Sequence, residues 1–91
     1  MKINAYSVYD TAAGTFATPF FAPNDEVAKR NFRYSLKRLD DLFVLDLELH
    51  LVGAFDTETS DFDNDFGYVV DTGKNVLSER EIEKKNSEVK Q

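Results

Sequence analysis

The run FVLDLELHLVGAFD, residues 43–56, constrains the fold more than any other stretch of the chain. Leucine recurs at every second position, and acidic residues and a histidine stand between the leucines. Alternate side chains of a β-strand point to opposite faces of the sheet, whereas a helical stripe needs a spacing of three or four. The run therefore predicts a strand with an apolar and a polar face. The apolar face holds Leu45, Leu47, Leu49 and Leu51, and the polar face holds Asp46, Glu48 and His50.

A hairpin is predicted at the start of the chain. Residues 2–9 (KINAYSVY) and 15–22 (TFATPFFA) are rich in residues that suit strands, and Gly14 closes the turn between them. Pro19 has no N–H to donate to a sheet, so we expect the second strand to lie at an edge or to be distorted there.

A helix and a last strand complete the pattern. The helix is predicted from Asn24, its N-cap, to about Leu39, because an apolar stripe recurs at helical spacing. The stripe consists of Ala28, Phe32, Leu36 and Leu39. Residues 61–70 (DFDNDFGYVV) predict a fourth strand.

These elements predict an α+β domain of order ββαββ over residues 1–73, in which one helix packs on one face of an antiparallel sheet. Residues 74–91 are a charged tail that forms either a short helix or a disordered segment. Ser78 and Glu81 offer a capping box for such a helix. A chain of 91 residues buries a small core, which favours a homodimer.

Composition narrows the functional classes. The chain has no Cys, which excludes disulfide scaffolds and zinc ribbons, and it has no apolar run like that of a signal peptide or a membrane span. We therefore expect a protein used in the cytoplasm. The net charge is -6, and residues 40–71 contain ten carboxylates and no Lys or Arg. Any binding to nucleic acid would have to come from a local basic patch.

No assembled active site is predicted. His50 is the only histidine, without a Cys or a recognisable serine nucleophile beside it, and there is no Gly-rich phosphate loop. Asp61, Asp63 and Asp65 resemble the start of a calcium loop, but Phe66 and Thr72 stand where Gly and Glu are required. We expect a protein that is not an enzyme and that carries neither a metal nor a cofactor.

The helix presents the main candidate site. Three of its cations are spaced by four residues and line one face, where they could follow a phosphate backbone while a tyrosine stacks on a base. The candidate residues are Lys29, Arg30, Arg33, Tyr34 and Lys37. The alternative interpretation of these residues is a solvated helix face.

The acidic strands present the opposite candidate, a negative surface that binds a basic protein or mimics DNA. Its residues are Asp46, Glu48, Asp61, Asp63 and Asp65. The basic helix of one copy could also dock on the acidic sheet of another.

Two segments carry a family resemblance. Residues 6–32 contain a strand ending in Asp, a turn closing with Gly, then Pro-Phe-Phe, Asn-Asp and Ala-x-Arg-x-Phe. These residues are Asp10, Gly14, Pro19, Phe20, Phe21, Asn24, Asp25, Ala28, Arg30 and Phe32. The second segment, residues 51–62, overlaps a Leu-x-x-x-Gly-x-Phe-Asp run formed by Leu49, Gly53, Phe55 and Asp56. In these features the chain resembles the small nonstructural protein of gokushovirus-type microviruses, which are phages with single-stranded DNA genomes.

The resemblance covers roughly the first two-thirds of the chain. It implies a DNA-binding accessory protein of single-stranded genome synthesis or packaging, acting with single-stranded DNA or the viral replication machinery in the host bacterial cytoplasm. The chain departs from the family pattern at Ser60, where the family has Gly, at the loop 37–43, and in the tail from Lys74.

Overall fold

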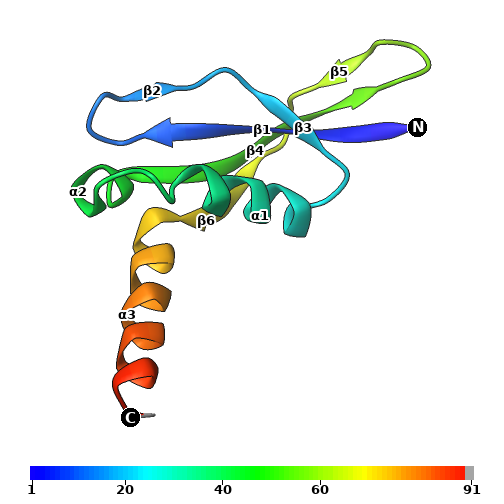
Figure 1. The fold of residues 1–91 in the computed structure, drawn as a ribbon. Coiled ribbons are helices and arrows are strands. Elements are labelled where there is room, and N and C mark those ends of the chain that lie inside the picture. The colour runs from blue at the N-terminus through cyan, green and yellow to red at the C-terminus, as the bar shows by residue number, and fades with distance from the viewer. Residues whose placement is uncertain (90–91) are drawn as a thin grey trace.

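A computed structural model describes residues 1–89 of the chain and the side chains of residues 1–86. The chain forms a curled antiparallel sheet with helices α1 and α2 on one side and helix α3 projecting from one end (Figure 1). The elements are β1 (Lys2–Asp10), β2 (Thr15–Phe16), β3 (Phe20–Ala22), α1 (Asp25–Ser35), α2 (Asp41–Val44), β4 (Leu47–Asp56), β5 (Phe62–Asp63), β6 (Tyr68–Thr72) and α3 (Gly73–Val89).

The sheet is built around one long antiparallel pair. Strands β1 and β4 pair from Lys2 opposite Asp56 to Asp10 opposite Leu47. Strands β2 and β3 follow one another along the outer edge of β1, and β6 and β5 lie along the outer edge of β4. The predicted α+β class and antiparallel sheet are confirmed.

The order of elements differs from the predicted ββαββ. The expected strand 15–22 is interrupted at Pro19 and becomes β2 and β3, as the missing N–H of proline led us to expect. The expected strand 61–70 is also divided, into β5 and β6. Gly67 lies between them, where a Cβ would stand 2.6 Å from the carbonyl oxygen of Leu51, so the chain passes too close to β4 for a side chain.

The prediction that a strand begins at residue 43 is wrong. Residues 41–44 form helix α2, and β4 begins at Leu47, so Leu45 and Asp46 lie outside the strand. Tertiary packing decides this: Val44 is fully buried in the core, whereas Leu45 is 44% exposed. The alternation of leucines holds from Leu47 onward, where Leu49 and Leu51 are buried.

Helix α1 begins as predicted and ends earlier. The side chain of Asn24 accepts a hydrogen bond of 2.9 Å from the backbone N–H of Val27, which confirms it as the N-cap. The helix ends at Ser35, and the chain continues in turns to residue 39. Leu36 still reaches the core, whereas Leu39 is 41% exposed and does not belong to the buried stripe.

The core lies between the sheet and helix α1 and includes the start of α3. Its members are Tyr6, Ala22, Ala28, Phe32, Leu36, Val44, Leu49, Leu51 and Val76. Of the two outcomes left open for the tail, the structure has the helix, which runs from Gly73 to Val89 rather than starting at Ser78. Val76 fixes its first turn against the core. Residues 90–91 of the predicted tail lie outside the described residues.

Candidate nucleic-acid interface

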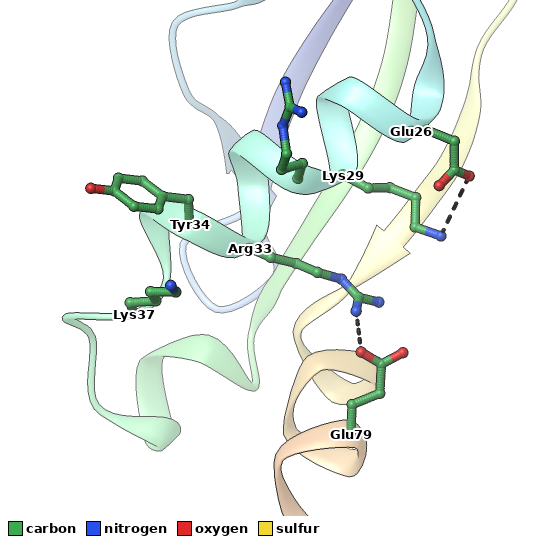
Figure 2. Close-up of a pocket in the computed structure, with 7 residues that line it drawn as sticks. Glu26, Lys29, Arg33, Tyr34, Lys37 and Glu79 are labelled. Atoms are coloured by element: carbon green, nitrogen blue, oxygen red, sulfur yellow. Dashed lines mark hydrogen bonds and ion pairs between the residues drawn. The ribbon is translucent and has the colours of Figure 1, made fainter. Parts of the chain in front are cut away.

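The predicted basic residues line a shallow groove of about 450 Å³ along α1, which the first turns of α3 close on one side (Figure 2). The groove is lined by Glu26, Lys29, Arg30, Arg33, Tyr34, Lys37 and Glu79. The structure thus brings all five predicted helix residues to one surface and adds two carboxylates that the sequence did not place there.

Arg33 is partly buried and is paired with carboxylates of the fold. Its Nε donates a hydrogen bond of 2.9 Å to the carboxylate of Asp71, and Nη2 lies 3.5 Å from the other oxygen of the same carboxylate. Nη1 is paired with Glu79 on α3. The hydrogen bond with Asp71, reinforced by the pairing with Glu79, raises the pKa of Arg33. This guanidinium joins α1 to β6 and α3, and its pairing leaves it little capacity to bind a phosphate.

Asp71 is the buried partner of this network. Its side chain is 2% exposed. Burial alone would raise the pKa of the carboxyl, but the hydrogen bonds from Arg33, the N–H of Thr72 and the amide of Asn75 outweigh it and lower the pKa. Asp71 therefore stays ionised at neutral pH and needs the positive charge of Arg33.

Lys29 is also partly neutralised. Its Nζ lies 3.9 Å from Glu26, one turn earlier on the same helix, and its side chain is 33% exposed. Figure 2 shows Lys29 and Arg33 directed toward carboxylates, while Tyr34 and Lys37 lie together at the other end of the groove.

That other end is the freest part of the basic surface. Tyr34 is 72% exposed, and the Nζ of Lys37 lies 5.3 Å from the centroid of its ring. Arg30 and Arg38, four residues before and after Tyr34, are exposed as well. We call this surface the Tyr34 platform; it consists of Arg30, Tyr34, Lys37 and Arg38. The candidate set from the sequence omitted Arg38, although its spacing of four residues from Tyr34 is a usable signal.

The acidic candidate residues do not form one surface. Asp46 and Glu48 lie at the start of β4, while Asp61, Asp63 and Asp65 are exposed on and around the β4–β5 hairpin. Asp63 pairs with Ala54, six residues beyond Glu48 along β4, which corresponds to roughly 20 Å. The three hairpin carboxylates form an acidic hairpin of their own.

Glu48 contacts a histidine on its own strand. Its Oε1 lies 3.0 Å from the Nε2 of His50, and the imidazole packs edge-on against Tyr9 and Phe16. Among the described residues, no group of three or more His, Cys, Asp or Glu side chains is arranged to hold a metal ion.

The fold and this surface define a class of protein: a small α+β domain with helices on one side of an antiparallel sheet and a cationic, aromatic platform at the end of α1. The family model described as Phage ORF5 protein matches residues 3–76, so the chain belongs to this family of phage proteins. The phage origin implied by the resemblance is confirmed. No curated protein and no solved structure matches the chain. Within the described residues, no helix combines the length and apolarity needed to cross a membrane.

Proposed function

We propose that this phage protein is a non-enzymatic accessory factor that binds single-stranded DNA during synthesis or packaging of a microvirus-type genome in the host bacterial cytoplasm. The observation that carries the proposal is the Tyr34 platform. An aromatic ring that is 72% exposed, with a lysine ammonium over it and two arginines beside it, has the groups that unpaired bases and phosphates require.

The size of the platform limits its affinity. Arg30, Lys37 and Arg38 supply three phosphate contacts, because Arg33 is paired with Asp71 inside the fold. Three contacts to a single strand give a slope of about −2 in log affinity against log salt, which is roughly a 20-fold loss between about 50 and 200 mM salt. Stacking of one base on Tyr34 adds about 1–3 kcal/mol, a contribution that salt affects little.

The test is a fluorescence-anisotropy titration with an oligo(dT) of about 10 nucleotides at these two salt concentrations. Lys37→Gln should weaken binding and reduce the salt slope by about 0.7. Tyr34→Ala should weaken binding roughly 5- to 150-fold with the slope unchanged. Lys84→Gln is the matched control, because it removes one exposed charge on α3, away from the platform.

Two results would count against DNA binding by the platform. One is the absence of binding by the wild-type protein at the lower salt concentration. The other is a loss of affinity in Lys84→Gln equal to the loss in Lys37→Gln, which would mean that binding depends on the overall charge of the protein and not on the platform.

The acidic hairpin supports a second candidate function, the binding of a basic viral or host protein. Asp61, Asp63 and Asp65 are exposed within five residues of one another on a hairpin that projects from the sheet (Figure 1). Charge reversal of Asp61 and Asp63 to Lys should then remove one protein from a pull-down out of infected cells and leave the oligo(dT) titration without loss of affinity. An unchanged pull-down would reject this function.

A further inference from the structure

The side of the sheet opposite α1 and α2 carries a second surface that the basic helix does not involve. Strand alternation and the register between strands assign its residues: Tyr9 lies opposite Phe16, Phe55 opposite Phe62, and His50 opposite Val69. We call this surface the open face. Its large apolar and aromatic residues are Ile3, Tyr9, Phe16, Phe21, His50, Phe55, Phe62 and Val69.

Within the described part of the chain, no helix covers the open face: α1 and α2 lie on the other side of the sheet, and α3 projects away from it (Figure 1). Its aromatic rings are nevertheless ordered against one another. The ring centroids of Tyr9 and Phe16 are 4.6 Å apart, those of Phe16 and His50 are 5.3 Å apart, and those of Phe21 and Phe55 are 5.9 Å apart.

The backbone supports this layer of rings. The ring of Phe62 lies over Gly53, where a Cβ would stand 2.8 Å from Cε1 of the ring. Yet Phe16 is 53% exposed, and Phe21, Phe62 and Val69 are each 48% exposed. Exposed rings gathered on one side of a sheet, in one group around Phe16 and another around Phe21, indicate a binding partner.

The charges on the open face indicate which partner. No Lys or Arg of the described strands belongs to it, because Lys2 pairs with Asp56 on the side that bears the helices. Glu48 lies on the open face and contacts His50. Phosphates would meet an apolar surface with a carboxylate at its edge, which is unfavourable. A second apolar sheet face has the matching chemistry.

The area of the face suits a dimer. Strands of nine or ten residues, such as β1 and β4, are about 30 Å long, and four strand widths span about 19 Å, so the flat area is on the order of 600 Å². Because the aromatic side chains protrude from the sheet, the accessible area is larger than this flat value. It therefore approaches the area of about 800 Å² per partner that a standard interface buries. We propose that the open face is a homodimer interface, in which two copies pack sheet against sheet about 10 Å apart around a two-fold axis.

The test is the mass of the protein by sedimentation equilibrium over a range of concentrations, for the wild type and for Phe16→Lys and Phe21→Lys. Each substitution occurs twice in a symmetric dimer and removes a buried ring each time, so the dimer should weaken about 100-fold or more. Phe43→Lys is the matched control: this ring is 66% exposed on α2, on the other side of the sheet, and its loss should leave the dimer intact.

A second measurement guards against variants that fail to fold. In a mixed sample of labelled and unlabelled wild-type protein, isotope-filtered NMR should show contacts between molecules at the rings of Phe16 and Phe21. A monomeric wild type would overturn the proposal, whatever else binds the open face. So would a dimer that Phe43→Lys weakens as much as Phe16→Lys, or a dimer without contacts at these rings. Loss of oligo(dT) binding in Phe16→Lys at unchanged mass would assign the open face to nucleic acid instead.

Discussion

Replacing Arg33 by Met tests whether this residue stabilises the fold or serves to bind DNA. The substitution keeps an unbranched side chain but removes the guanidinium, so the Asp71 carboxylate, which is 2% exposed, loses its counter-ion. Removing one partner of a buried pair costs about 3–5 kcal/mol. Asp71 keeps its hydrogen bonds to the N–H of Thr72 and the amide of Asn75, so we expect the lower end of this range, about 3 kcal/mol.

This loss is large for a domain of 91 residues, whose total free energy of unfolding is expected to be about 5–14 kcal/mol. The measurement is urea unfolding followed by circular dichroism at pH 7. If the free energy of unfolding falls by about 1 kcal/mol per molar urea, the loss of stability lowers the midpoint of unfolding by about 3 M. Lys37→Met is the control, because Lys37 is exposed and its loss should change stability by less than about 0.5 kcal/mol. Adding Asp71→Asn to Arg33→Met removes the unpaired charge and should recover part of the loss. Equal midpoints for Arg33→Met and Lys37→Met, or no recovery in the double variant, would refute the structural role.

The pairing of Arg33 with Asp71 determines which residues can be changed to test DNA binding. Reversing the charge of Arg33 would bring a second carboxylate beside Asp71, so a loss of DNA binding would reflect destabilisation of the fold as well as a lost contact with phosphate. Lys37 and Arg30 can be changed without this effect, because both are exposed and neither pairs with a carboxylate in the described residues.

Two further predictions concern the core. Burial and the hydrogen bond of 2.6 Å to Asp25 raise the pKa of Tyr6 from 10.0 to about 12. The neutral phenol therefore stabilises the fold fully below pH 10, and about 3 kcal/mol is lost as the pH rises through 12. Urea titrations should show a larger loss in the wild type than in Tyr6→Phe, which keeps Tyr68, a second phenol whose pKa the hydrogen bond with Asp25 raises; an equal loss in both would contradict it. A Cβ at Gly73 would overlap the carbonyl oxygen of Val44, so Gly73→Ala should cost about 3 kcal/mol and lower the melting temperature by more than about 10 °C. The neighbouring exposed Lys74→Ala should not, and a melting temperature for Gly73→Ala equal to that of Lys74→Ala would reject this steric argument.

The local signals of the sequence predicted the two main elements. Alternating leucines give β4 from Leu47 onward, and Asn24 with the stripe through Ala28 and Phe32 gives α1, because both patterns depend only on neighbouring residues. Helix α2 was missed because four residues are too few to show a period. Its helical form depends on burying Val44 beside Gly73, which is far along the chain.

The candidate site depended on long-range contacts that no local pattern contains. Arg33 has the same helical spacing as Lys29 and Lys37, and only its contact with Asp71, 38 residues later, distinguishes it. The open face was missed for a related reason. Alternation shows that β1 has two faces, with Tyr6 on one and Tyr9 on the other, but it does not show which face the helices cover.

Dimerisation through the open face would affect DNA binding by the Tyr34 platform. The Tyr34 platform lies on the end of α1 and the turn that follows it, on the side of the sheet away from the open face, so a dimer formed through the open face leaves both platforms exposed. A platform with three cations binds weakly by itself, but two linked platforms on one strand can gain about 10²- to 10⁴-fold when the strand spans both. Phe16→Lys should therefore reduce affinity for an oligo(dT) of about 40 nucleotides and leave affinity for one of about 10 nucleotides unchanged. Equal effects on the two lengths would show that the dimer has no part in DNA binding, even if each proposal holds separately.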